Sequence, residues 1–209
     1  MTIMRSVALV MLAAQGAAVA QGQDAEPNLD NFASVATMTV SFPFGDAHRF
    51  ASNPSWVGFN WEGQWAVRRS LVAGALLGMH DFFERSDGTL EFPSGSATGE
   101  QARELTMATM LAIARWYPGG TRWHGVYLGV GAGTIWARES FQLGVFDPIL
   151  NSAFHLAVVP EAAVTVPIFE GVNGMVGVRY SLTAPAGSYL GGGKRSFHFL
   201  TLTFSLLEH

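Results

Sequence analysis

The chain has 209 residues and a formal net charge of −4; 49% of its residues are hydrophobic and only 13% are charged. This length corresponds to a single domain. The high apolar fraction excludes a disordered chain, and the lack of a basic excess excludes a typical nucleic-acid-binding protein. Because a soluble domain needs roughly a quarter or more of its surface charged, we expect a membrane protein.

The first segment, residues 1–20, has the pattern of a secretory signal peptide. Arg5 supplies a positive charge, Val7–Ala14 forms a short apolar core, and Ala18–Ala20 is a small-x-small cleavage site. The core is too short to cross a bilayer, which takes about 20 residues, so we expect cleavage after Ala20. Residues 21–33 are then expected to form a flexible periplasmic leader, followed by one domain over 34–209.

Beyond the signal peptide, no run of about 18 apolar residues is free of charge and proline, so we expect no membrane-spanning helix. Short alternating segments occur instead. We predict eight strands, at 36–45, 55–66, 69–84, 103–117, 122–137, 153–168, 174–184 and 196–207. Since only helices and closed barrels satisfy every backbone hydrogen bond in lipid, these strands indicate a transmembrane β-barrel.

The two faces of the predicted strands differ in chemistry. In the strand at 55–66, Phe59 and Trp61 share one face, whereas Asn60 and Glu62 share the other. We expect the bulky apolar face to contact lipid and the small or polar face to line a narrow lumen. A soluble barrel would have the reverse arrangement, with an apolar interior and a charged exterior.

The connections between the predicted strands alternate in length. The long ones are 46–54, 85–102, 138–152 and 185–195, and the short ones are 67–68, 118–121 and 169–173. Long extracellular loops and short periplasmic turns are typical of outer-membrane barrels.

Aromatic residues gather at the predicted strand ends, as expected for two girdles at the membrane interfaces. Those beside the short turns are Trp65, Trp116, Tyr117 and Trp123, and those toward the long loops include Trp56, Trp136 and Tyr180.

Gly177-Val178-Arg179-Tyr180 lies in the penultimate predicted strand, and aromatic residues alternate through Phe197–Phe204 in the last one. With the signal peptide, these segments resemble the small eight-stranded outer-membrane barrels of Gram-negative bacteria, the group around the OmpA transmembrane domain. The resemblance covers 34–209 and implies an all-β, antiparallel, up-and-down transmembrane barrel. Its partners would be outer-membrane lipids, lipopolysaccharide and the barrel-insertion machinery. Such barrels usually end on an aromatic residue, whereas here Ser205–His209 follows Phe204.

Several ionisable residues fall on the side of the strands assigned to the lumen. They are Glu62, His80, Glu104, His155, Glu161 and Arg179. Buried charges need partners, and we expect Arg179 to pair with Glu161, joined by Glu62 or Glu104. The resemblance implies that such ion pairs plug or gate a narrow pore. Removing Arg179 is then expected to destabilise the barrel or to open a conductance.

An eight-stranded barrel is just wide enough for side chains to fill, which argues against a general, porin-like channel. We therefore expect a structural or surface-interaction role, with a polar side-chain network filling the lumen. The alternative is a narrow channel or a route for small, possibly apolar, molecules.

Two further alternatives have less support in the residues. Lipid A deacylases carry a His-x-Ser motif in a late strand, whereas the matching segment here is Arg179-Tyr180-Ser181, and the pair Ser196 and His198 has no obvious carboxylate. Gly63-Gln64-Trp65 matches a lipocalin triplet, but the inner faces are polar and small, unlike a lipocalin cavity. The six histidines show no metal-ligand spacing, so we expect no metal, no cofactor and no enzymatic activity.

Overall fold

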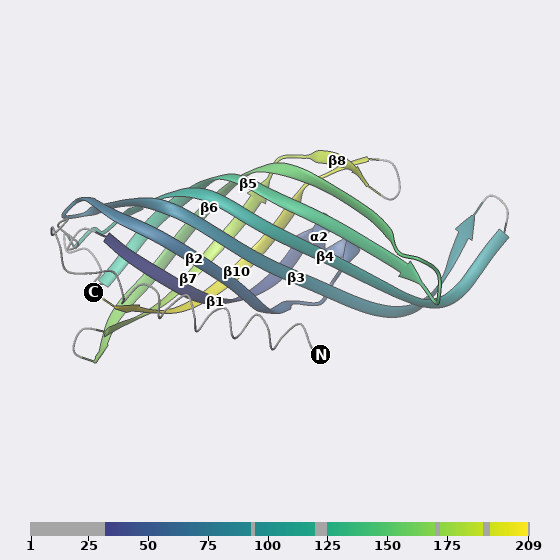
Figure 1. The fold of residues 1–209 in the computed structure, drawn as a ribbon, viewed down its shortest axis with the longest axis horizontal. Coiled ribbons are helices and arrows are strands. Elements are labelled where there is room, and N and C mark those ends of the chain that lie inside the picture. The colour runs from purple at the N-terminus through teal and green to yellow at the C-terminus, as the bar shows by residue number, and fades with distance from the viewer. Residues whose placement is uncertain (1–31, 93–94, 120–124, 170–171, 190–192, 209) are drawn as a thin grey trace, which may run out of the picture. The chain divides into compact units, whose positions relative to one another are not determined.

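The computed structural model describes residues 32–92, 95–119, 125–169, 172–189 and 193–208. The predicted signal peptide and nearly all of the predicted leader lie outside these residues. Eight antiparallel strands form a closed barrel in the order β1-β10-β7-β6-β5-β4-β3-β2 (Figure 1). Each strand pairs with its neighbours along the chain, and the pairing of β1 with β10 closes the barrel. The predicted up-and-down, all-β barrel is therefore confirmed.

Each predicted strand corresponds to one barrel strand. Most of the observed strand ends differ from the predicted ends by a few residues. The barrel strands are β1 (Phe32–Gly45), β2 (Ser55–Arg68), β3 (Leu71–Phe92), β4 (Gly95–Trp116), β5 (Gly125–Leu143), β6 (Ile149–Phe169), β7 (Val172–Thr183) and β10 (Phe197–Glu208). The long loops contain a short helix, α2 (Asp46–Phe50), and a two-stranded hairpin, β8 (Ala186–Tyr189) with β9 (Gly193–Arg195). The barrel begins at Phe32, two residues before the expected boundary at 34. No helix in the described ranges is long and apolar enough to cross a membrane.

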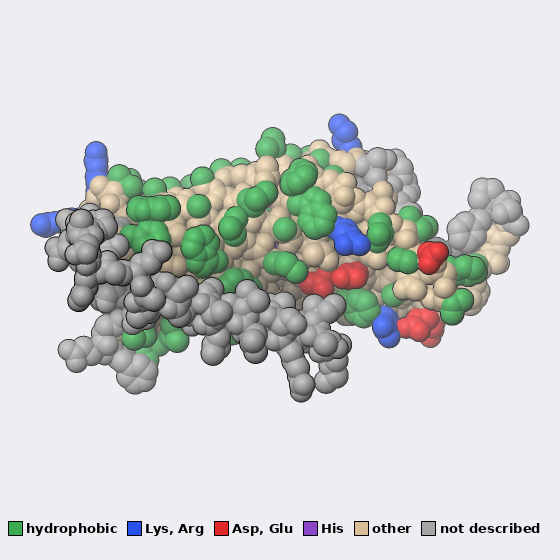
Figure 2. Space-filling view, viewed as in Figure 1, with side chains coloured by type: hydrophobic (Ala, Val, Ile, Leu, Met, Phe, Trp, Pro, Cys, Tyr) green, Lys and Arg blue, Asp and Glu red, His purple; other side chains and the backbone are tan. Residues whose placement is uncertain are grey.

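Large apolar side chains cover the outer face of the barrel, which we call the apolar belt. Figure 2 shows hydrophobic side chains along the barrel wall, with charged side chains toward its two ends. The belt includes Met38, Trp61, Leu77, Leu128, Leu156, Val178 and Phe204. These residues are exposed because alternate positions of each strand point outward, where lipid rather than water is the favourable surrounding.

The apolar belt ends where polar side chains take over the outer positions. Asp81 and Arg138 lie in register on either side of Thr106, whose hydroxyl donates a hydrogen bond of 3.1 Å to the Asp81 carboxylate. Glu104, two residues from Thr106, has the same outward direction. Strand residues beyond this row, toward the long loops, therefore lie outside the belt. We call this end of the barrel the loop end and the opposite end the turn end.

β3 and β4 continue well past the belt, so the predicted 85–102 loop is wrong. The two strands have 22 residues each, about twice the length needed to cross a bilayer, and pair continuously from Leu71–Trp116 to Phe92–Gly95. In Figure 1 this hairpin extends past the ends of the other strands. A hydrogen bond of 2.8 Å between the Thr89 and Thr98 hydroxyls joins its two strands. The predicted 138–152 loop is likewise shorter, because β5 and β6 extend into it.

The barrel interior has three layers rather than the uniformly small and polar filling that was expected. The turn end holds an apolar cluster that includes Val35, Tyr117 and Tyr127, and the middle holds charged side chains. At the loop end a larger apolar cluster includes Phe82 and Phe199. β3 and β4 are apolar on both faces, and their inward-facing residues, such as Leu76 and Leu111, supply part of these clusters.

Candidate functional site

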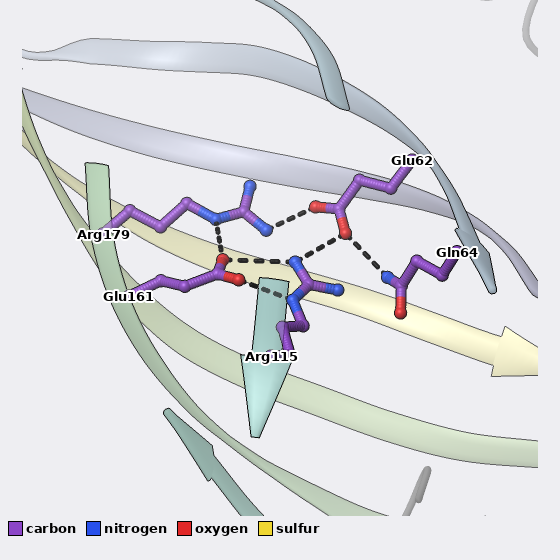
Figure 3. A network of polar contacts seen from close by, with 5 residues as sticks. All are labelled: Glu62, Gln64, Arg115, Glu161 and Arg179. Atoms are coloured by element: carbon purple, nitrogen blue, oxygen red, sulfur yellow. Dashed lines mark hydrogen bonds and ion pairs between the residues drawn. The ribbon is translucent and has the colours of Figure 1, made fainter. Parts of the chain in front are cut away.

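Four charged side chains from four strands meet in the middle layer of the lumen (Figure 3). Glu62 comes from β2, Arg115 from β4, Glu161 from β6 and Arg179 from β7. β2 and β6 stand opposite each other in the closed strand order, so these side chains bridge opposite walls of the barrel. We call this group the lumen network.

Each carboxylate of the lumen network contacts both guanidinium groups. Arg115 Nη2 lies 2.7 Å from Glu62 Oε2, and Arg115 Nε lies 2.5 Å from Glu161 Oε1. Arg179 Nε lies 2.7 Å from Glu161 Oε2, and Arg179 Nη2 pairs with Glu62 Oε1. The side chains are at most 5% exposed, and the charges sum to zero. This mutual pairing of the charged groups is what makes four buried charges tolerable.

The surrounding residues fit the shape and charge of the network. Gly129 stands in register between Arg115 and Glu161 on the intervening strand, and a Cβ there would lie 2.6 Å from Glu161 Oε1. The missing side chain lets the two charged groups meet across β5. The Arg115 guanidinium also lies 4.7 Å from the centre of the Tyr127 ring, a cation–π contact. Gln64 donates a hydrogen bond of 2.8 Å to Glu62.

The structure brings Glu62, Glu161 and Arg179 together, with Arg179 and Glu161 as neighbours on adjacent strands. Glu104 was wrongly assigned to the lumen. It shares the outward direction of Trp116, because positions that differ by an even number lie on the same face of a strand. Arg115, which was not among the residues expected in the lumen, is the fourth charged member of the network instead of Glu104.

Two predicted lumen histidines lie outside the network. His155 is buried at the loop end, where its Nδ1 lies 3.0 Å from the Ala184 carbonyl oxygen and its ring packs 5.0 Å from Phe197. His80 Nδ1 lies 3.0 Å from the Ser41 hydroxyl, in turn 2.9 Å from Thr201. His155 therefore does not belong to the predicted ion-pair network.

The predicted aromatic girdle is outward-facing at five positions. Trp56 is 69% exposed, Trp65 and Trp116 are 52% exposed, and Trp136 and Tyr180 are half-buried on the outer side. Tyr117 was wrongly placed in the girdle: it follows the outward Trp116, so it points inward and packs 5.4 Å from Tyr127. Trp123 lies outside the described residues.

A second barrier closes the lumen above the network. Phe82 and Phe199 lie with their ring centres 5.9 Å apart and are fully buried. α2 turns inward over this layer, burying Ala47 and Phe50 in the same apolar cluster. Between the apolar layer and the lumen network lies a cavity of about 10 Å³, which is room for about one water molecule.

Above the apolar layer, the loop end holds a cavity of about 690 Å³, which we call the mouth cavity. Its lining comes from α2, the β3–β4 hairpin, the β5–β6 connection and β9. The lining residues are Asp46, Arg49, Phe50, Ala97, Arg103, Phe141, Leu143, Phe146, Asp147, Ile149 and Arg195. This volume falls in the range of sites for small molecules.

Two ion pairs hold the floor of the mouth cavity. Arg195 Nη1 lies 2.6 Å from the buried Glu139 Oε1, and the Arg195 guanidinium lies 5.6 Å from the Phe50 ring centre. Asp46 pairs with Arg49 and accepts a hydrogen bond of 2.9 Å from the Ser196 N–H. Although partial burial raises the pKa of Asp46, these contacts outweigh it and keep that pKa below its ordinary value.

Neither an enzymatic triad nor a metal cluster emerges from the described residues. His198 Nε2 lies 3.3 Å from Ser196 Oγ, but Asp46 contacts the backbone of Ser196 and not the imidazole. A triad needs a carboxylate that orients the histidine ring. Within the described ranges, no group of three or more His, Asp or Glu side chains could hold a metal ion.

Comparison with solved structures finds small barrels of the same architecture. Neisserial surface protein A (NspA) matches with a TM-score of 0.51 and 13% identity, covering 85% of this chain and 96% of that one. Ail, the attachment invasion locus protein of Yersinia pestis, matches with a TM-score of 0.46 and 11% identity, over 85% and 97% of the two chains. Ail in complex with the heparin analogue sucrose octasulfate gives a TM-score of 0.45 at 10% identity, covering 85% and 96%.

The likeness to NspA supports the fold, that of a small eight-stranded β-barrel. The scan against protein-family models and the search of curated proteins found no match.

Proposed function

We propose that this protein is a non-conducting barrel of the Gram-negative outer membrane that displays a surface-interaction platform outside the cell. In this proposal the signal peptide is removed after Ala20, the insertion machinery places the barrel, and outer-membrane lipids and lipopolysaccharide surround the apolar belt. The loop end faces outward, since long loops are extracellular in such barrels. The protein acts as an anchored binding surface and not as an enzyme.

The observation that carries this proposal is the double closure of the lumen. The lumen network bridges opposite walls with paired, buried charges, and the Phe82–Phe199 layer closes the barrel again toward the loop end. An ion crossing the barrel would have to displace both layers. This arrangement favours a structural or surface role over a narrow channel.

The elements beyond the belt support the display of a surface. The β3–β4 hairpin continues far past the row of Asp81 and Arg138, and α2 and the β8–β9 hairpin give the other loops a defined structure. A barrel that served only as a membrane anchor would not need such extended strands. We propose that these elements contact molecules outside the cell.

Conductance across planar lipid bilayers tests the closed barrel. We expect the wild-type protein to give no steady current, and Arg179→Ala to give none either, because the Phe82–Phe199 layer still blocks the lumen. Heat-modifiable electrophoresis confirms that each sample is folded. A steady single-channel current from the folded wild type would instead favour the channel alternative.

A further inference from the structure

The mouth cavity ends blindly on the apolar layer. α2 and Phe50 separate it from the interior, and Phe50 is 6% exposed. A molecule that entered from the loop end would therefore stay in the cavity and could not pass through the barrel. This geometry is typical of a binding site and not of a transport route.

The walls of the mouth cavity combine apolar surface with arginine. Phe141, Phe146 and Ile149 line one side, and Phe146 is 67% exposed although it belongs to a short turn beyond the belt. Ile149 and Leu150, close to Phe146 in the chain, are also exposed, and a contiguous apolar patch on a water-facing loop marks a site for a ligand or partner. The apolar wall therefore fits the hydrocarbon part of a ligand.

Arg103 is the cation of the cavity that makes no close ion pair among the described residues. Glu84 stands opposite Arg103 on β3 and interacts with it electrostatically, but the Glu84 carboxylate accepts its hydrogen bond from the Ser52 N–H. Arg49 pairs with Asp46 and Arg195 pairs with Glu139, whereas no carboxylate of the described residues lies within ion-pair distance of Arg103. The Arg103 guanidinium lies 5.9 Å from the Phe141 ring centre and donates a hydrogen bond of 2.8 Å to Gln101. These contacts hold the positive charge against the apolar wall.

We propose that the mouth cavity binds an amphipathic anion, a single-chain molecule with a carboxylate or phosphate head and a hydrocarbon tail. The head pairs with Arg103, and the tail lies against Phe141, Phe146 and Ile149. Asp147, also in the lining, repels the head and limits the affinity. This inference deepens the proposed surface role and rests on the loop end being accessible from outside.

The test measures the displacement of dansyl-undecanoate from the protein in lipid nanodiscs, with empty nanodiscs as background. Laurate and dodecyl phosphate compete as anions, and dodecanol and dodecylammonium are the uncharged and cationic analogues. We expect the anions to bind at least tenfold more tightly than either analogue. The ratio of the two anions tells a fatty acid from a phosphorylated lipid as the source.

Two matched pairs of variants place the ligand. Arg103→Gln should weaken laurate binding about tenfold to a hundredfold, whereas Arg138→Gln, which removes the same charge from the outer face of β5, should leave it within twofold. Phe146→Ala should weaken binding of the anions, whereas Val145→Ala, on the same turn but outside the lining, should not. Asp147→Asn should strengthen binding of the anions, because it removes the negative charge that repels the head group.

Equal effects of Arg103→Gln and Arg138→Gln, or equal binding of dodecylammonium and laurate, would overturn the proposed ligand. Conductance is measured on the same folded samples. A conducting barrel would refute the proposed closed function while leaving the binding result intact, so the two failures are distinguishable.

Discussion

Arg115→Met is expected to lower the free energy of unfolding by about 3–5 kcal/mol, one of the largest losses available to a single substitution in this barrel. Arg115 contacts both Glu62 and Glu161, and all three side chains are nearly completely buried. Without it, two carboxylates share the one guanidinium of Arg179, and one negative charge stays uncompensated in the lumen. Urea titration of the barrel in lipid vesicles, followed by gel mobility, measures the loss.

The double variant Arg115→Met with Glu62→Gln serves as the matched control. It leaves the neutral pair of Glu161 and Arg179, so most of the lost stability should return even though two charges are gone. Arg138→Met removes an arginine from the outer face and should cost little. If Arg115→Met and Arg138→Met cost the same, the lumen network does not hold the barrel together.

Leu156→Arg is expected to destabilise the folded barrel by about 2–4 kcal/mol, because it places a charge inside the apolar belt. Leu156 is 70% exposed on the outer face of β6. Such an exposed position on a water-soluble protein would accept arginine at almost no cost. The same urea titration in vesicles measures the difference.

Leu150→Arg is the control for depth in the membrane, because it places the same charge on the same face of β6 but outside the apolar belt. Leu150 lies beyond Ser152, which is in register with Arg138 at the edge of the belt, so its cost should be about 0–1 kcal/mol. Equal costs at positions 150 and 156 would mean that the belt does not face lipid as described.

Most barrel strands could be predicted because their two faces differ in chemistry. In β2, β7 and β10 the apolar positions alternate with small or polar ones, and the structure confirms both the strands and the directions of their side chains. The location of β4 could be predicted but its direction could not, since Leu111 and Ile113 point inward while Met110, also apolar, points outward. When both faces of a strand are apolar, the sequence pattern does not show which face points into the barrel.

The error at Glu104 and the omission of Arg115 have one cause: Trp116 and Tyr117 were both placed in the girdle, although adjacent positions of a strand face opposite sides. Trp116 was expected to face outward, and Glu104 lies an even number of positions away on the same strand. Fixing the direction of β4 from Trp116 turns Glu104 outward, and it turns Arg115 and Tyr117 inward.

The mouth cavity could not be predicted from the sequence. Gly, Ser and Thr in 85–102 are typical of a loop, yet this segment extends β3 and β4 because each strand satisfies the other's backbone hydrogen bonds. Arg103, Phe146 and Arg195 come from three separate segments and meet only when these loops fold together. Such contacts depend on tertiary structure and have no local pattern.

The most direct test of the barrel is a nitroxide scan of β6 in lipid vesicles, which the cysteine-free chain allows without background substitutions. Single cysteines at 154–166 are spin-labelled, and collisions with oxygen report exposure to lipid. Oxygen accessibility should alternate with a period of two, high at Leu156, Val158 and Val164 and low at Ala157 and Ala163 between them. A profile without alternation, or one with high accessibility at the odd-numbered positions, would contradict a barrel with this lipid-facing outer face.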